Sequence, residues 1–196
     1  MKRSIIPFIL IVYALFDYVL NLSMTIDDLN NSNVEAFVSK LGQIFENSPW
    51  VAREAYQKKP FKYVDDLFNA MIQVLMNSGR EKQLELIRAH PNLAGHDMLK
   101  GNLSQFSTNE QANAGLNILT KQQMTEFNSL NFAYKSRFNF PFILALRDQN
   151  KGGICGILAE FRRRITNSEE AEIDESLSQI GRIARHRLET MFEPKG

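Results

Sequence analysis

His90 is the side chain whose setting best suits it to move protons, because it directly precedes Pro91. Proline has no amide hydrogen and disfavours helical geometry in the residue before it, so the pair holds the imidazole at a helix end. An imidazole with its ordinary pKa of about 6.5 can donate or accept a proton at cellular pH. The alternative is a structural histidine that hydrogen-bonds the last helical carbonyls, and spacing alone favours that use.

The polar run from Ser107 to Gln111 is the second candidate. Glu110 lies three residues after Ser107, which is the spacing of a helix capping box. In a functional interpretation, the same helical turn presents a hydroxyl, a carboxylate and an amide to a ligand. Spacing does not separate these two interpretations.

Three successive arginines, Arg162 to Arg164, form the third candidate. Neighbouring helical positions point about 100° apart, so at most one or two of these side chains can face inward. Runs of this kind are usually solvated. Arg164 can nevertheless offer a bidentate clamp for a carboxylate, or a planar donor for a urea-like group.

The remaining reactive side chains are few. Cys155 is the single cysteine, which excludes an internal disulfide and a cysteine-rich metal site. Its apolar context is more typical of a small buried hydrophobic residue than of a nucleophile. His90, His96 and His186 lack zinc-binding spacing, and no glycine-rich phosphate loop or nucleophile elbow is present. We therefore expect no metal site and no nucleotide cofactor.

The elements that position these residues have the apolar periodicity of helices. We expect helices at about residues 34–45, 51–56, 64–76, 81–89, 109–119, 122–138, 154–165 and 169–192. Ser107 or Thr108 would cap the helix at 109–119, Thr120 would cap the next, and residues 98–106 would form a loop. The run from Phe142 to Leu146 is the best strand candidate, but it can equally be an extended core segment. The fold class is all-α, a single helical domain of roughly seven to nine helices.

The composition is that of one globular domain. The chain has 196 residues, of which 44% are hydrophobic and 23% charged, so it has enough apolar material for a core and is not a disordered protein. Lysine and arginine total 23 against 22 acidic residues, a net charge of +1. This balance lacks the basic excess of a nucleic-acid binder, so we expect no nucleic-acid partner.

The first 23 residues differ from the rest of the chain. Two early basic residues precede an apolar run from Ile5 to Leu22, which is typical of a secretory signal or a membrane anchor. Asp17 would be costly inside a membrane. Alternatively Met24 is the true start and residues 1–23 are an extended gene start, or the segment is a packed N-terminal helix. The functional domain spans residues 24–196, and it is cytoplasmic unless the leader anchors or exports it.

Five motifs follow one another along the chain. They are Phe45-Glu46-Asn47-Ser48-Pro49-Trp50-Val51-Ala52, Ile87-Arg88-Ala89-His90-Pro91-Asn92-Leu93-Ala94-Gly95, Ser107-Thr108-Asn109-Glu110-Gln111, the stretch from Leu130 to Phe142, and Arg164-Ile165-Thr166-Asn167. Together they resemble the OHCU decarboxylase family, the 2-oxo-4-hydroxy-4-carboxy-5-ureidoimidazoline decarboxylases, over about residues 24–192. The resemblance implies an all-helical homodimer that forms (S)-allantoin from this small-molecule substrate during urate degradation. Urate oxidase and hydroxyisourate hydrolase would be its pathway partners.

The same resemblance implies roles for individual residues. His90 corresponds to the catalytic proton donor and Glu110 to the second catalytic residue. The implied substrate-binding residues are Pro91, Ser107, Glu110, Gln111, Phe140, Pro141, Phe142, Ile143, Leu144 and Arg164. Asn92 replaces the Asp that usually follows His-Pro in the family, which argues against a required charge at this position.

The expected chemistry needs no cofactor. Carbon dioxide leaves a carbon next to an imine or carbonyl, and the heterocycle itself delocalises the electrons that remain. The protein then has only to orient the substrate, stabilise it and deliver a proton from one face. The competing hypothesis is a helical interaction module without catalysis, which fits the composition but not five ordered polar motifs.

Overall fold

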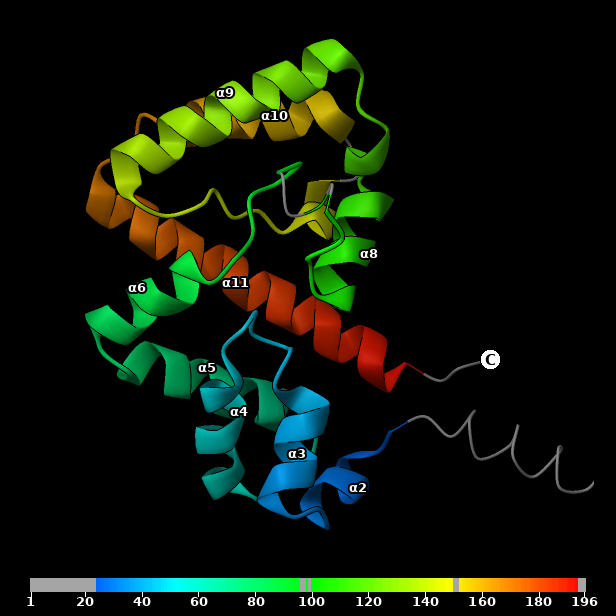
Figure 1. Ribbon diagram of the computed structural model, residues 1–196. Helices are drawn as coiled ribbons and strands as arrows, with labels where there is room; N and C mark the ends of the chain where they lie inside the picture. The colour runs from blue at the N-terminus through cyan, green and yellow to red at the C-terminus, as the bar shows by residue number, and fades with distance from the viewer. Residues whose placement is uncertain (1–23, 96–97, 99, 150–151, 194–196) are drawn as a thin grey trace, which may run out of the picture.

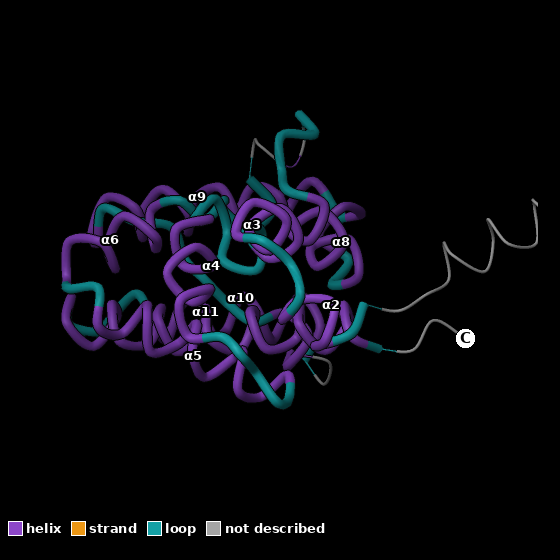
Figure 2. The backbone as a smooth tube through the Cα atoms, turned by 90° about the horizontal axis from the view of Figure 1, so that it is seen from below, coloured by secondary structure: helices purple, strands orange, loops and turns teal. Residues whose placement is uncertain are grey.

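A computed structural model describes residues 24–95, 98, 100–149 and 152–193. Within these residues the chain forms nine α-helices and three short 3-10 helices, and no strand. Figure 2, coloured by secondary structure, shows helices that are joined by loops. The all-α prediction is confirmed, whereas the predicted leader at residues 1–23 lies outside the described residues.

Helix α11 runs through the middle of the molecule. The helices before it are α2 (Ile26–Asn30), α3 (Val34–Leu41), α4 (Pro49–Ala55), α5 (Val64–Asn77), α6 (Arg80–Arg88), α8 (Gln105–Asn113), α9 (Lys121–Phe138) and α10 (Gly153–Arg164), and α11 itself spans Glu169–Phe192. Figure 1 shows α11 between the α9 and α10 pair on one side and α3 to α6 on the other. Because α11 packs on α5 and α6, its inward side chains reach elements far away in the sequence.

Local signals explain where several helices begin. Asn33 at the start of α3 and Ser168 at the start of α11 each accept a hydrogen bond from the backbone amide three residues later. Thr120, the predicted cap of α9, exchanges hydrogen bonds with Gln123 in a capping box. These side chains satisfy amides that have no partner within the helix.

The start of α8 differs from the prediction. Ser104 accepts the capping hydrogen bond, so the helix begins at Gln105, inside the segment predicted to be a loop. Neither Ser107 nor Thr108 is the cap. Ser107 instead lies inside the first turn, where its hydroxyl is available for contacts outside the helix.

The end of α8 also differs from the prediction. The helix ends at Asn113, before Gly115 adopts left-handed geometry with a φ of 77°. A 3-10 helix over Leu116–Ile118 follows. Left-handed geometry suits glycine because it has no Cβ, and here it breaks the predicted helix over residues 109–119.

The segment predicted as a strand or an extended core segment is the latter. Residues 141–145 are extended without a strand partner, and Leu146–Gln149 forms a 3-10 helix. Side chains from α10 and α11 replace the missing ladder: Arg164 donates to the Ile143 carbonyl at 2.6 Å, and the Ala145 amide donates to Gln179 at 2.9 Å. Helices therefore hold this segment through side-chain hydrogen bonds.

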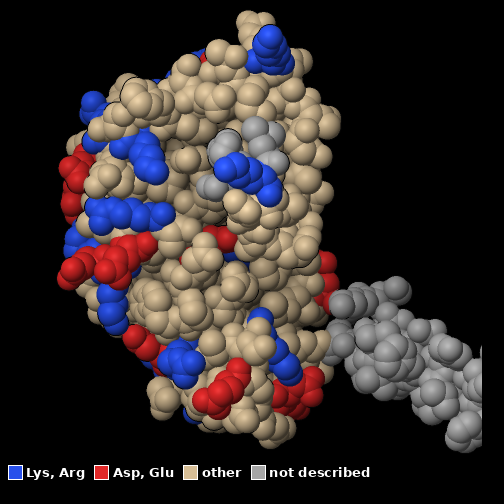
Figure 3. Space-filling model, in the orientation of Figure 1, with Lys and Arg blue, Asp and Glu red and all other residues tan. Residues whose placement is uncertain are grey.

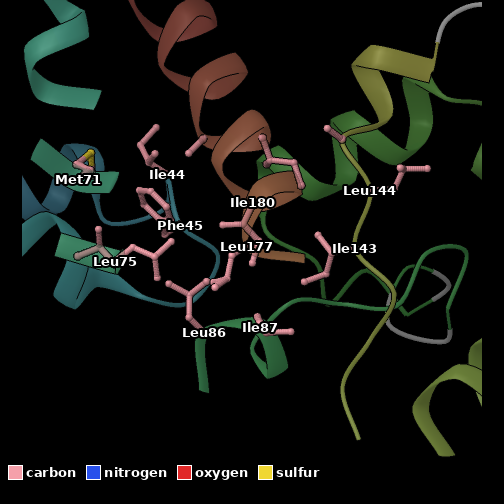
Figure 4. Close-up of a cluster of buried hydrophobic side chains, with 14 of the residues drawn as sticks. Ile44, Phe45, Met71, Leu75, Leu86, Ile87, Ile143, Leu144, Leu177 and Ile180 are labelled. Carbon is pink, nitrogen blue, oxygen red and sulfur yellow. The ribbon is translucent and has the colours of Figure 1, made fainter. Parts of the chain in front are cut away.

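Apolar side chains from both halves of the chain form one buried core that includes Ile143 and Leu144. Figure 4 labels Ile44, Phe45, Met71, Leu75, Leu86, Ile87, Ile143, Leu144, Leu177 and Ile180, all of which are buried. Burial of apolar surface stabilises such contacts by roughly 25 cal/mol per Å². The contacts of Ile143 and Leu144 with this core tie the extended segment to α11.

The surface carries both signs of charge. On the face shown in Figure 3, basic and acidic side chains are interspersed, and uncharged surface covers much of the rest. Among the residues described, no helix is both long enough and apolar enough to span a membrane.

Candidate active site

A small pocket brings together residues of α8, α11, the His-Pro segment after α6 and the extended segment. Its lining consists of His90, Pro91, Leu93, Ser107, Glu110, Gln111, Phe142, Ile143, Leu144, Leu146, Ile183 and Arg187. The predicted site residues are all in this list except Phe140, Pro141 and Arg164. Phe140 and Pro141 line a neighbouring cavity together with His90 and Pro91.

The pocket is small and has wider cavities beside it. Its volume is about 30 Å³, much smaller than the volumes of the cavities beside it. The cavity that shares His90 and Pro91 measures about 410 Å³. A second cavity of about 360 Å³ shares Glu110 and Arg187. A ring-sized ligand therefore needs side-chain movement to enter the pocket.

His90 has both a structural and a pocket-facing role. Its Nδ1 lies 2.9 Å from the Leu86 carbonyl in α6, and because a carbonyl only accepts, Nδ1 carries the hydrogen. Nε2 then keeps its lone pair for the pocket. Burial is the main cause that lowers the pKa of His90, to about 4, and the charge of Arg187 adds to it, whereas the Leu86 carbonyl and Glu46 act in the opposite direction. The imidazole is therefore neutral at pH 7.

Three side chains of α8 form one polar face. Ser107, Glu110 and Gln111 are three and four residues apart, so they project on the same side of the helix. The Ser107 hydroxyl donates to Glu46 at 2.8 Å, and the Gln111 side-chain oxygen accepts from the Ala94 amide at 2.9 Å. The capping-box interpretation of Ser107 and Glu110 is wrong, because both side chains make tertiary contacts.

Arg187 of α11 is the charged centre of the pocket, and the sequence analysis missed it. The residue is 2% exposed. Its Nε and Nη2 donate to the two oxygens of Glu110 at 2.7 and 2.8 Å, and its Nη1 donates to Glu46 at 3.0 Å. Although burial disfavours the charge, these two carboxylates raise the pKa of Arg187.

The sequence does contain a signal for Arg187. Its neighbours Arg182 and Arg185 make the end of α11 look like a solvated basic face. However, Arg187 follows Ile180 by seven residues and Ile183 by four, so it lies on the apolar stripe of the helix. An arginine on that stripe must be buried with partners.

Glu46 is the second buried residue that the sequence analysis did not assign to the site. It is 1% exposed, follows α3, and lines the cavity next to His90. Burial alone would raise its pKa, but the Ser104 hydroxyl, the Arg187 guanidinium and the Ser107 hydroxyl together lower the pKa of Glu46. It is therefore a buried carboxylate held in its charged form.

Arg164 lies outside the pocket lining, so its position does not support the predicted direct contact with substrate. It is fully buried and pairs with Glu172, to which its Nε donates at 2.8 Å. Its link to the pocket is the hydrogen bond from Nη1 to the carbonyl of Ile143. Arg164, at the end of α10, thus links the backbone of the extended segment to Glu172 of α11.

Cys155 and possible metal ligands lie apart from this chemistry. Cys155 is exposed, so the expectation of a buried cysteine is wrong, and it does not line the pocket. No group of three or more potential metal ligands occurs among the described residues. His96 falls outside the described residues.

Comparison with known sequences gives consistent matches. A family model described as OHCU decarboxylase matches residues 30–189. A 2-oxo-4-hydroxy-4-carboxy-5-ureidoimidazoline decarboxylase of Haloferax volcanii is 38% identical over 169 residues, covering 86% of this chain and 96% of that protein. The uric acid degradation bifunctional protein PucL of Bacillus subtilis is 39% identical over 172 residues, which is 88% of this chain and 33% of that protein.

The solved structures that are similar to this chain include two crystal structures. An (S)-allantoin synthase crystal structure matches with a TM-score of 0.66 and 29% identity, over 87% of this chain and 55% of that one. An OHCU decarboxylase crystal structure obtained in the presence of (S)-allantoin matches with a TM-score of 0.62 over 82% of this chain and 99% of that one. The identity in this second case is 17%, so it concerns the fold alone.

Proposed function

The chain belongs to the OHCU decarboxylase family, and we propose that the pocket around His90 and Arg187 is the site of its reaction. The protein is a decarboxylase of urate degradation that acts on 2-oxo-4-hydroxy-4-carboxy-5-ureidoimidazoline. Family membership favours this function over the non-catalytic interaction module. The observation that carries the site assignment is the convergence of a neutral imidazole, a carboxylate and a guanidinium in one pocket.

The substrate itself supplies most of the chemistry. Its carboxylate and hydroxyl share one ring carbon, and the ureido group is on the neighbouring ring carbon. The bond to the carboxylate breaks and CO₂ leaves. Its electron pair forms a double bond to the ureido-bearing carbon, and the electrons of the ring C=N bond move to the ring nitrogen. The hydroxyl proton then passes to that nitrogen as the hydroxyl carbon becomes a carbonyl, and the ureido-bearing carbon takes one added proton. The ring is its own electron sink, so we propose a cofactor-free reaction.

His90 is the proposed source of the proton. It is neutral in this structure, and the substrate carboxylate brings a negative charge into the pocket. Nearby negative charge favours the imidazolium form, so substrate binding is accompanied by proton uptake at Nε2. After CO₂ departs, a fixed imidazolium delivers that proton to one face of the ring. This one-sided delivery accounts for a single product enantiomer, (S)-allantoin.

The other lining groups have binding roles. We assign the guanidinium that binds the substrate carboxylate to Arg187 instead of Arg164, because Arg187 lines the pocket and Arg164 does not. Glu110 accepts the hydrogen of the substrate hydroxyl as the carbonyl forms. Ser107, Gln111 and the backbone of residues 142–144 match the amide-like groups of the ring and the ureido arm.

Freshly generated substrate with circular dichroism detection tests this function. Wild-type protein should accelerate formation of optically active (S)-allantoin. The His90→Asn variant should stay folded, because its amide can still donate to the Leu86 carbonyl, but it lacks Nε2 and should lose stereospecific turnover. Glu110→Ala should lose it as well. Wild-type rates in the His90 variant would refute the proton-transfer role.

Further properties are proposed on the resemblance alone. They are a homodimer and pathway partnership with urate oxidase and hydroxyisourate hydrolase. Size-exclusion chromatography with light scattering tests the dimer. Coupled turnover from urate with both upstream enzymes tests the pathway order.

A further inference from the structure

All the hydrogen-bond donors of Arg187 are already engaged within the protein. A guanidinium has five N–H donors. Nε and Nη2 donate to Glu110, and Nη2 also reaches the Ser107 hydroxyl at 3.2 Å. Nη1 donates to Glu46 at 3.0 Å and to the Gln43 carbonyl at 3.1 Å. A ligand can therefore bind this guanidinium only by replacing one of these partners.

The two carboxylates on Arg187 differ in how easily they can be replaced. The Glu46 side chain is 2% exposed, whereas that of Glu110 is 30% exposed. Glu46 also accepts the Ser107 hydroxyl, so releasing it would leave a buried charge and a buried hydroxyl without partners. Glu110 borders the wider cavity of about 360 Å³ and can turn toward it. Glu110 is therefore the exchangeable partner.

The cavity beside Arg187 favours such an exchange. The pocket is narrow, at about 30 Å³, whereas the substrate is a five-membered ring with carboxylate, hydroxyl and ureido substituents. Glu110 and Arg187 line both the pocket and the wider cavity. If Glu110 moved away from Arg187, the pocket and the wider cavity would become one continuous space. Release of Glu110 would therefore enlarge the space that is open to the substrate beside Arg187.

Resting on the proposed function, we propose that Glu46 is a positioning residue that holds Arg187 in the pocket while the substrate carboxylate replaces Glu110 on the guanidinium. Exchange of one carboxylate for another preserves the ion pair, so Arg187 is not left uncompensated. Glu110 is then free to reach the substrate hydroxyl. Without Glu46, Glu110 would be the one charged partner of Arg187 in the pocket, and the guanidinium would follow it.

A comparison of two ligands tests the role of Glu46. The substrate carries the carboxylate and the product (S)-allantoin does not, so the ratio of the substrate KM to the allantoin inhibition constant reports on carboxylate binding. In Glu46→Ala this ratio should rise about tenfold or more, as expected for a lost hydrogen bond to a charged group. Glu46→Gln keeps an acceptor oxygen and should show a smaller rise, of about twofold to fivefold.

The matched control is Glu172→Gln. Glu172 is also a fully buried carboxylate paired with a buried arginine, Arg164, but it does not touch Arg187. This variant should lose stability to a similar extent without a change in the ratio. A purely structural Glu46 would behave like Glu172, with lower thermal stability and an unchanged ratio, and that result would overturn the proposal.

The remaining outcomes are also decisive. If Glu46→Ala does not fold, Glu46→Gln decides alone, and an unchanged ratio in that variant refutes the role of Glu46. The wild-type protein is measured in the same series. Its failure to turn over substrate would refute the proposed function and this inference together, whereas wild-type turnover with an unchanged ratio would refute the role of Glu46 alone.

Discussion

Replacing His90 by asparagine should make the protein less sensitive to mild acid. The pKa of His90 is lowered from 6.5 to about 4, mainly because the imidazole is buried. Between these values the unfolded chain binds a proton at His90 and the folded chain does not. The free energy of unfolding therefore falls as the pH falls from 6.5 toward 4, and this part of the stability is fully present above pH 6.5. Asparagine does not titrate, so the variant lacks this loss.

The size of the effect follows from the pKa difference. One pKa unit corresponds to about 1.4 kcal/mol, so His90 accounts for a loss of about 3 kcal/mol by pH 4. Between pH 7 and pH 5 the loss is about 2 kcal/mol. The informative quantity is the difference between wild type and variant, because it cancels the protons that all other groups bind in this pH range.

Urea unfolding followed by circular dichroism at pH 7 and pH 5 measures this difference. Wild type should lose about 2 kcal/mol more than His90→Asn between the two values. The variant keeps a donor for the Leu86 carbonyl, so its stability at pH 7 serves as the control for packing. Equal losses in both proteins would show that His90 is not held neutral by burial, and would refute the neutral charge assigned to it.

Three further substitutions test separate parts of the structure. Arg187→Lys should raise the substrate KM by about tenfold or more, because an ammonium cannot pair with a carboxylate through two parallel hydrogen bonds; an unchanged KM in steady-state assays would argue against this residue as the carboxylate site. Arg164→Met should lower the free energy of unfolding by about 3 kcal/mol in urea titration, because it leaves the buried Glu172 carboxylate without its partner. Cys155→Ser should retain wild-type turnover, since the thiol is exposed and does not line the pocket, and a large loss would reopen a nucleophilic role.

The helices were largely predictable because their signals are local. The prediction of a helix over residues 169–192 coincides with α11, and the prediction over 64–76 differs from α5 by one residue. Apolar periodicity and capping side chains depend on residues within one or two turns. Such signals can be recognised in the sequence without knowledge of the tertiary contacts.

The start of α8 shows where local signals become ambiguous. Ser104, Ser107 and Thr108 are all good caps by residue type. The structure uses Ser104, because the Ser107 hydroxyl bonds to Glu46, which lies 61 residues away in the sequence. A choice between equivalent local caps was therefore made by a tertiary contact.

The sequence alone determined the all-α class, the family and most of the pocket residues, because these depend on local pattern and ordered motifs. It did not determine which buried arginine lines the pocket. Arg164 and Arg187 both lie on inward helix faces, yet Arg187 meets Glu110 and Glu46 across separations of 77 and 141 residues. Charge pairing depends on distance through space, and the packing of α11 between the two halves of the molecule sets that distance.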